Sequence, residues 1–257
     1  MTPMPPDLLA RLGPYGSTRV EAGESGGTVH RLAATGLRTL FLKEGGGVVA
    51  EAITDEMARL AWLAGRVAVP ELVQFVRADG PAWLLTTAVS GETTEVQAKR
   101  GDVSALVEPM AAFLRALHAL PVDECPFDSS APVRLAAARS AMAAGSVDAD
   151  DFDDEHRGWT PEQVWERMMA LRPAGFGRVV THGDFSLGNL LVENGRVTGC
   201  IDVGRTGVAD PYQDLAICWA NWEEIDAGLG ERFLAAYGLE TVDRDRLAFH
   251  LCLDEFF

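Results

Sequence analysis

Short runs rich in apolar and β-branched residues, separated by turn residues, recur in the first third of the chain and predict β-strands there. Four such runs are Thr28–Leu32, Thr39–Lys43, Leu72–Arg77 and Trp83–Thr87. Between the second and third runs, apolar residues recur at helical spacing from Val49 to Gly65, and a glycine suits the end of a helix. We therefore expect a small sheet with one helix, followed by an extended linker at Thr87–Gly91.

Beyond the linker, the apolar positions change to a helical period. One stripe predicts a core helix: Val103, Leu106, Met110, Phe113-Leu114 and Leu117. Further helices are predicted at Val133–Ala144, at Pro161–Leu171 and from Ala209-Asp210-Pro211 through Trp219, with a helical pattern continuing to the last residue. The change predicts an α+β protein of two lobes. Residues 1–88 form an antiparallel sheet with one helix, and residues 89–257 are mostly helical with a hairpin.

The segment Val179–Arg205 carries the candidate chemistry. The apolar pair Val179-Val180 predicts the end of a buried strand, and His182-Gly183-Asp184 follows it, with Asn189 five residues after the aspartate. Asn194-Gly195 between two apolar runs is a strong hairpin signal. The second strand of that hairpin is expected to return Asp202 toward Asp184 and Asn189.

Two carboxylates and an amide oxygen at one strand end suit Mg²⁺, which usually takes one or two carboxylates plus substrate phosphates. Asn189 and Asp202 are therefore candidate metal ligands, and Asp184 is left to orient an attacking hydroxyl. Protein kinases space their catalytic Asp and metal-binding Asn in this way, although this chain has glycine where they have arginine. The alternative is that the three residues form an unrelated cap, turn and strand end.

A lysine at a strand end and a glutamate on the next helix form a second kinase-like pair. Lys43 could hold phosphates and Glu56 could hold Lys43, although Glu51 and Asp55 are rival partners on the same helix. Beside Lys43, Phe41 is either an apolar lid for an adenine ring or an ordinary core residue.

Two backbone segments are candidates for contacting a nucleotide. The Gly/Ser run Gly23–Gly27, which contains Ser25, could bring N–H groups to phosphates, or it could be a plain hairpin turn. The linker at Thr87–Gly91, with Thr87 and Val89, could offer its backbone to an adenine edge.

Net charge narrows the class of partner. The 257 residues include 38 acidic and 22 basic ones, a net charge of −16. This charge disfavours nucleic acid and attracts polycationic small molecules. The start MTPMPPDLLARLG is not a secretory signal, no run approaches the ~20 apolar residues of a membrane span, and four scattered cysteines favour free buried thiols. We expect a cytoplasmic protein without a membrane partner, as a monomer or weak homodimer.

Several segments together resemble the aminoglycoside 3'-phosphotransferases, kinase-like enzymes of antibiotic resistance, over nearly the whole length. They are FLK at 41–43, Trp62-Leu63, CPFD at 125–128, VVTHGD through IDVGR at 179–205, GVADPYQDLA at 207–216 and the terminal LDEFF. The resemblance implies a protein-kinase-like fold, ATP and Mg²⁺ as cofactors, and transfer of phosphate to the 3'-hydroxyl of an aminoglycoside.

The resemblance also implies a role for each matching residue. Asp184 would be the catalytic base, Arg205 would orient the site beside it, and Lys43 paired with Glu56 would contact the phosphates. The nucleotide would also meet Ser25, Phe41, Thr87 and Val89. The antibiotic amines would meet a set of acids and the last carboxylate: Asp153, Asp154, Glu224, Asp254, Glu255 and Phe257.

Two features leave alternatives open. Six acids in the eight residues Asp148–Glu155 form a solvated loop by composition alone and become ligands only through the resemblance. Relatives often have an acid where this chain has Asn221, which bears on the range of antibiotics. The core motif also admits a small-alcohol kinase acting on a choline- or homoserine-like substrate. A non-catalytic nucleotide-binding module would require the loss of a catalytic or metal residue, yet Lys43, Asp184, Asn189 and Asp202 are all present.

Overall fold

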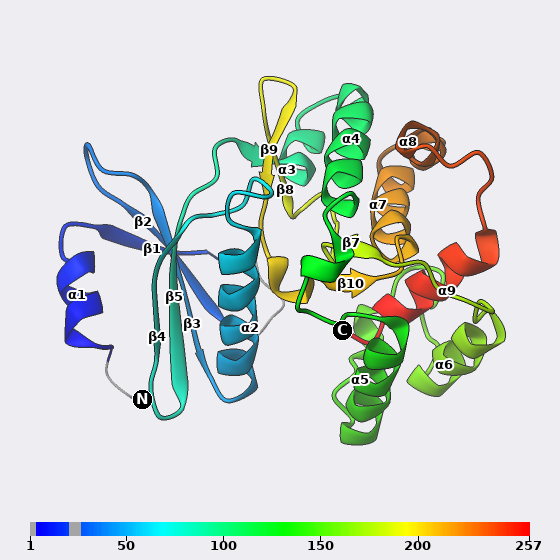
Figure 1. Cartoon of the computed structure of the whole chain (residues 1–257), viewed down its shortest axis with the longest axis horizontal. Helices are drawn as coiled ribbons and strands as arrows, with labels where there is room; N and C mark the ends of the chain where they lie inside the picture. Colours follow the sequence, from blue (N-terminus) through cyan, green and yellow to red (C-terminus); the bar gives the residue numbers. More distant parts are fainter. Residues whose placement is uncertain (1–3, 21–26) are drawn as a thin grey trace. The chain divides into compact units, whose positions relative to one another are not determined.

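The computed structural model describes residues 4–20 and 27–257 (Figure 1). Its internal contacts divide the chain into two compact units. The sheet unit consists of Met1–Gly91, Leu191–Glu193 and Thr198–Arg205, and the helical unit consists of Glu92–Leu190, Asn194–Val197 and Thr206–Phe257. The sheet unit therefore includes two later segments, one of which contains Asp202. The division of the chain after residue 88 stays a prediction.

The sheet unit contains a five-stranded antiparallel sheet of order β1-β2-β3-β5-β4. Its strands are β1 (Gly16–Val20), β2 (Thr28–Ala33), β3 (Leu40–Gly46), β4 (Leu72–Arg77) and β5 (Pro81–Thr87). The four strands predicted from apolar-rich runs are all present as β2, β3, β4 and β5. The sequence pattern did not predict β1, because its first four residues are exposed at the sheet edge and do not form an apolar run. It also missed the short helix α1 (Pro6–Leu12).

Apolar side chains are buried on both faces of β5. Trp83 and Leu85 belong to a cluster that also contains Leu8 of α1 and three leucines of β2 and β3, Leu32, Leu40 and Leu42. The alternate residues Ala82 and Leu84 point to the opposite face and are equally buried. The helix α2 (Val48–Leu63) packs on β3, β4 and β5.

A hairpin carries the later segments of the sheet unit. Its strands β8 (Leu190–Glu193) and β9 (Arg196–Cys200) belong to a three-stranded sheet of order β6-β8-β9, with β6 at Glu92–Thr93. Asn194 and Gly195 have φ values of 51° and 73°, the left-handed pair that an Asn-Gly hairpin turn requires. The backbone N–H of Cys200 donates to Ala68 O at 3.0 Å. The hairpin is the one that the sequence predicted.

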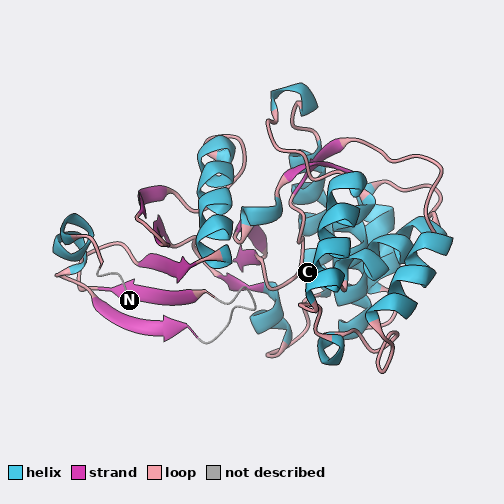
Figure 2. Ribbon diagram, turned by 90° about the horizontal axis from the view of Figure 1, so that it is seen from below, coloured by secondary structure: helices cyan, strands magenta, loops and turns pink. Residues whose placement is uncertain are grey.

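Most of the described α-helices, which Figure 2 draws in cyan, belong to the helical unit. Its helices are α3 (Thr94–Ala98), α4 (Val107–His118), α5 (Ala131–Ala144), α6 (Pro161–Ala170), α7 (Tyr212–Ile225), α8 (Leu229–Tyr237) and α9 (Arg244–Asp254). The predicted core helix is α4. Several boundaries differ by a few residues, and at the start of α7 the reason is the strand β10 (Gly207–Ala209), which pairs with β7 (Val179–Thr181), so that α7 begins only at Tyr212. The α+β class predicted from the change of period is correct.

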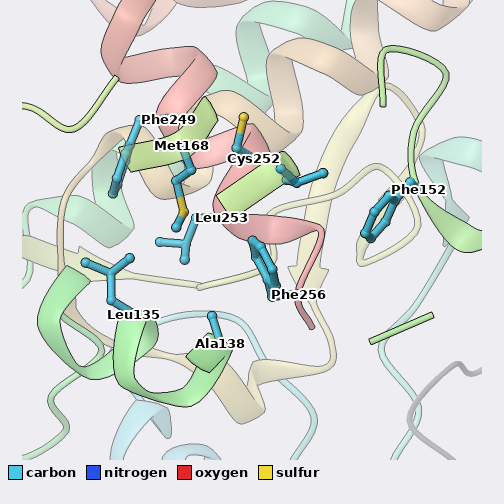
Figure 3. Close-up of a cluster of buried hydrophobic side chains, with 9 residues drawn as sticks. Leu135, Ala138, Phe152, Met168, Phe249, Cys252, Leu253 and Phe256 are labelled. Atoms are coloured by element: carbon cyan, nitrogen blue, oxygen red, sulfur yellow. The ribbon is translucent and has the colours of Figure 1, made fainter. Parts of the chain in front are cut away.

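A hydrophobic cluster joins α5, α6 and α9 (Figure 3). Its buried members are Leu135, Ala138, Phe152, Val164, Met168, Phe249, Cys252, Leu253 and Phe256. Phe152 comes from the acidic segment Asp148–Glu155, so this segment has an apolar anchor. No helix within 4–20 and 27–257 is long and apolar enough to cross a membrane.

Candidate active site

Lys43 lies on β3 and pairs with two carboxylates of the sheet unit. Its Nζ donates to Glu56 Oε2 at 2.9 Å and to Asp202 Oδ1 at 2.8 Å. The rival acids have other partners, since Glu51 pairs with Arg77 and Asp55 with Arg59. Burial works against the charge of Lys43, but the charges of Glu56 and Asp202 raise its pKa above the ordinary value. Lys43 therefore stays an ammonium ion suited to phosphate oxygens.

Asp202 has an unusual backbone conformation. Its φ of 56° is left-handed, and among the described non-glycine residues only Asn194 shares a positive φ. Aspartate tolerates this region better than most side chains, and such strain commonly accompanies functional sites. Asp202 precedes the short 3₁₀ helix η4 (Val203–Arg205), which packs against α2. The turn aims one carboxylate oxygen at Lys43 while half of the side chain stays exposed.

Asp184 and Asn189 are joined within the helical unit. Asn189 Nδ2 donates to Asp184 Oδ2 at 2.9 Å and to the Asp184 carbonyl at 3.1 Å. This arrangement uses the hydrogens of the amide and not its oxygen, which remains a hard acceptor of the kind that a divalent cation takes. We call residues Asp184–Asn189, which contain the candidate catalytic base, the catalytic loop.

The fully buried carboxylate of Asp214, on α7, holds the backbone that enters the catalytic loop. It accepts the N–H groups of His182 at 2.7 Å and Gly183 at 2.8 Å, and it lies 3.0 Å from His118 Nε2. His118 Nδ1 in turn lies 2.8 Å from the hydroxyl of Tyr237. Burial opposes ionisation, but the hydrogen bond from His118, the neighbouring histidines and the backbone amides lower the pKa of Asp214 below its ordinary value.

Two further side chains of α7 reach the same backbone. Gln213 Nε2 donates to the Gly183 carbonyl at 3.3 Å, and Asn221 Oδ1 accepts the N–H of Leu187 at 3.1 Å. Sequence reasoning gave no role to Gln213 or Asp214. A signal was available, because an aspartate and a glutamine stand inside the otherwise apolar run YQDLAICW. Buried polar residues in such a run must have partners.

The acidic segment contributes carboxylates that crowd one another. Burial raises the pKa of Glu224, on α7, and the charges of Asp153 and Asp154 raise it further. Asp153 is exposed, and partial desolvation together with the charge of Asp254 raises its pKa. These four acids of the helical unit therefore form one negative cluster.

The end of α9 lies beside this cluster. Asp254 Oδ1 accepts a hydrogen bond from Arg134 Nη2 at 3.0 Å, and the guanidinium of Arg134 lies 4.6 Å from the centre of the Phe257 ring. Glu255 Oε2 accepts the backbone N–H of Asp153 at 3.2 Å. Asp154 pairs with Arg157. The predicted substrate acids of the helical unit thus share neighbours, and Asp154, Asp254 and Glu255 already have protein partners.

The remaining predicted nucleotide contacts lie in the sheet unit. Ser25 lies outside the described residues. Phe41 is partly buried on β3, opposite Thr86 of β5. Thr87 uses its backbone N–H on Glu71 O, and its hydroxyl accepts the N–H of Glu71.

Two further predicted residues border the hairpin segment of the sheet unit. A side chain at Gly199 would meet Ala68 O at 2.6 Å and Val89 Cγ1 at 3.0 Å, so Val89 packs against the hairpin. Arg205 is the last residue of η4. Neither contact tests the nucleotide or catalytic role that the resemblance implies for these residues.

The sequence has extensive similarity to known proteins. A model of the phosphotransferase enzyme family matches residues 17–250. An aminoglycoside 3'-phosphotransferase of Escherichia coli is 49% identical over 258 residues, covering 99% of this chain and 95% of the relative. The chain belongs to the phosphotransferase enzyme family. Another aminoglycoside 3'-phosphotransferase, from Salmonella typhimurium, is 47% identical over 98% of the chain and 94% of the relative.

Solved structures agree with this membership. The crystal structure of an aminoglycoside-3'-phosphotransferase of type VIII superposes with a TM-score of 0.85 at 36% identity, covering 98% of this chain and 97% of the other. An aminoglycoside phosphotransferase of Streptomyces rimosus, solved with ADP and streptomycin, gives a TM-score of 0.81 at 30% identity over 97% and 95% of the two chains. The kinase-like fold that the motifs implied is thereby confirmed, and the chain is a phosphotransferase.

Proposed function

We propose that this protein transfers the γ-phosphoryl group of ATP to the 3'-hydroxyl of aminoglycosides of the kanamycin and neomycin type, and so confers resistance to them. The observation that carries the proposal is full-length similarity at 47–49% identity to enzymes named for this reaction. Lys43, Asp184, Asn189 and Asp202 are all present, which argues against a non-catalytic nucleotide-binding module.

Phosphoryl transfer requires mainly positioning and charge stabilisation from a protein. Asp184 is proposed to accept a hydrogen bond from the attacking hydroxyl, orient it and take its proton. The contact with Asn189 restricts the rotamer of the Asp184 carboxylate, which supports this role. Lys43, kept charged by Glu56 and Asp202, is proposed to bind phosphate oxygens, and Arg205 to orient the site.

Mg²⁺ is the metal that the proposed reaction requires, and the residues fit it. Asp202 offers a half-exposed carboxylate, and Asn189 offers an amide oxygen that its bonds to Asp184 do not use. These two residues would hold the ion, which usually keeps waters and binds substrate phosphates besides one or two protein ligands. When bound, it supplies neutralisation of phosphate charge.

The proposed nucleotide contacts are the backbone around Ser25, the Phe41 ring and the segment from Thr87 to Val89. Glu71 O accepts the N–H of Thr87, and Thr39 O accepts that of Ala88, so an adenine nitrogen is expected to accept the N–H of Val89 rather than those of these two residues. Solved relatives contain ADP or AMP-PNP, which supports a nucleotide site of this kind.

The aminoglycoside is proposed to bind at the negative cluster of Asp153, Asp154, Glu224 and Asp254, with Glu255 and Phe257 beside it. The raised pKa values of Asp153 and Glu224 reflect burial and mutual repulsion, which ammonium groups would relieve. The similar proteins with bound streptomycin or hygromycin B support an aminoglycoside as the class of substrate.

A substrate panel tests the proposal most simply. Coupled ATP turnover should be measured with kanamycin, neomycin, choline and homoserine, with the phosphorylated position assigned by NMR. We expect turnover with the two aminoglycosides and phosphate on the 3'-oxygen. Turnover with choline or homoserine alone would replace the proposal with a small-alcohol kinase. The proposal includes a cytoplasmic location. It also includes a monomer or weak homodimer, and light scattering of the purified protein would test this oligomeric state.

A further inference from the structure

The acidic segment Asp148–Glu155 is fixed to α9 by its own side chains. Phe152 is 5% exposed and packs in the cluster that contains Cys252, Leu253 and Phe256 of the chain end (Figure 3). The side chain of Asp148 caps the short 3₁₀ turn that follows it. A run of six acids thus has a defined conformation despite its composition.

His156, just after the acidic segment, is almost completely buried between α9 and the neighbouring loop. Its Nδ1 lies 2.5 Å from Glu255 Oε1, and its Nε2 lies 3.6 Å from Cys252 Sγ. The ring of Trp159 meets it edge-on with 5.2 Å between the centroids. Both ring nitrogens therefore contact side chains of α9, and the histidine has one defined orientation.

Glu255 joins the two ends of the short turn from Asp153 to His156. One carboxylate oxygen accepts the N–H of Asp153, and the other contacts His156 Nδ1. The turn is closed by the bond from His156 N to Asp153 O, at 2.9 Å. Only 6% of the Glu255 side chain is exposed, and a carboxylate so far from water is tolerated because it is hydrogen-bonded.

We infer that His156 is a positioning residue for aminoglycoside binding, which acts by holding Glu255 and, through it, the turn from Asp153 to His156 that also contains Asp154. The inference rests on the proposed function, since it assigns a structural basis to the same substrate site. A segment already ordered loses less conformational entropy when it binds a substrate. His156 therefore contributes to the affinity for the aminoglycoside and not to the phosphoryl-transfer step or to nucleotide binding.

Three variants separate this role from packing. His156→Phe keeps a ring but loses the nitrogen facing Glu255, and His156→Asn places an amide nitrogen near the position of Nδ1. Cys252→Ser is the matched control, because it nearly keeps the size of a buried side chain and changes the contact on the Nε2 side while leaving the contact with Glu255 intact. We expect His156→Phe to raise the aminoglycoside KM about tenfold or more, from the loss of a partner for a buried charge. Its kcat and its KM for ATP should stay within about twofold.

The control variants give the contrast. His156→Asn should recover most of the aminoglycoside KM, and Cys252→Ser should leave it near the wild-type value. Thermal unfolding of each variant checks the fold. Should His156→Phe not fold, His156→Gln takes its place with the same expectation, because its amide reaches past the Nδ1 position.

A second readout needs no enzymatic activity and so stands even if the proposed substrate is wrong. Arg157 directly follows His156, and 76% of its side chain is exposed. Trypsin cleavage between Arg157 and Gly158 therefore reports release of the acidic segment from α9. Cleavage after Arg100, 65% exposed in another part of the helical unit, is the internal reference. The ratio of the two rates should rise in His156→Phe and stay near wild type in His156→Asn. An unchanged ratio, or an unchanged aminoglycoside KM in a folded His156→Phe, overturns the inference.

Discussion

The catalytic loop and the acidic segment are both short stretches of the helical unit that carry polar side chains. They differ in whether their carboxylates, and those of their neighbours, have partners of opposite charge. In the catalytic loop and the backbone before it, the polar groups described above have protein partners, and Asp214 is buried with a lowered pKa. In the acidic segment and its neighbours, burial and like charges raise the pKa values of Asp153 and Glu224. The ionised Asp214 of the first region has protein partners before any ligand arrives, whereas Asp153 and Glu224 of the second region face like charges.

This difference matches what the two regions are proposed to do. Positioning for phosphoryl transfer depends on groups that do not reorganise during the reaction, and the polar partners on α7 provide this for the backbone around Asp184. Recognition of a polycation depends on charge that the free protein does not neutralise. Repulsion between carboxylates is therefore expected to destabilise the acidic segment in the free protein and to increase its affinity for ammonium groups.

The largest effect expected from breaking the catalytic region is at Asp184. Asp184→Asn keeps the shape of the side chain but removes the proton acceptor, so kcat should fall by about 10²–10⁴-fold. The aminoglycoside KM should change little, because the negative cluster is intact. Steady-state kinetics of the purified variant checks both values, and near-normal kcat would remove Asp184 from the mechanism.

The next effect is on stability at Asp214. Asp214→Asn turns one of the two oxygens that accept the N–H groups of His182 and Gly183 into a donor. A buried donor left without an acceptor costs about 1–3 kcal/mol, and kcat should fall together with stability. Urea unfolding at pH 7 measures the loss, with Asp226→Asn at the exposed end of α7 as the control.

The pH dependence of the Asp214 effect has a definite sign. The pKa of Asp214 is lowered in the folded state, so its stabilisation is complete above the unfolded value of 3.8 and is lost as the pH falls through the folded value. The stability gap between wild type and Asp214→Asn should therefore narrow as the pH falls below 3.8. A gap that widened in acid would contradict the assignment of Asp214 as the ionised anchor.

A smaller effect, of opposite sign, is expected at Asp153. Because its pKa is raised in the folded state, its ionised form is disfavoured at neutral pH, so Asp153→Asn should raise Tm slightly. Because the Asp153 side chain is exposed, solvent screens the repulsion, and the gain should stay below the ~2–4 °C that 1 kcal/mol gives in a chain of this size. The same variant should raise the aminoglycoside KM several-fold.

Asp151→Asn is the matched control for Asp153→Asn, since Asp151 is exposed in the same segment. It should leave both Tm and KM near their wild-type values. Calorimetry and kinetics on the three proteins test the trade-off, and a lower Tm in Asp153→Asn would show that its carboxylate stabilises the fold.

The two regions also differ in how far the sequence predicted them. Asp184, Asn189 and the Asn194-Gly195 turn lie within one short stretch, so local spacing and turn chemistry were enough to single them out. Lys43 and Glu56 needed the fold, because Glu51 and Asp55 were equivalent in the sequence until Arg77 and Arg59 were seen to pair with them.

The contacts that the sequence could not predict join residues far apart in the chain. Asp214 and His118 meet across two helices, and His156 meets Glu255 ninety-nine positions later. Neither pairing leaves a local pattern. The strand β1 was missed for a different reason. It is an exposed edge strand whose sequence contains no apolar run.

The ionic-strength dependence of kcat and KM for kanamycin tests most directly the central claim, that the catalytic region is charge-satisfied and the acidic segment is not. Exposed charges are screened within ~8–10 Å near physiological salt, whereas buried, paired groups are screened much less. We predict a KM that rises steadily with salt, a kcat that stays nearly constant, and a weaker rise of KM in Asp153→Asn. A KM that is flat from low to high salt would contradict the account, because Asp153, Asp154 and Glu224 would then be an ordinary solvated surface.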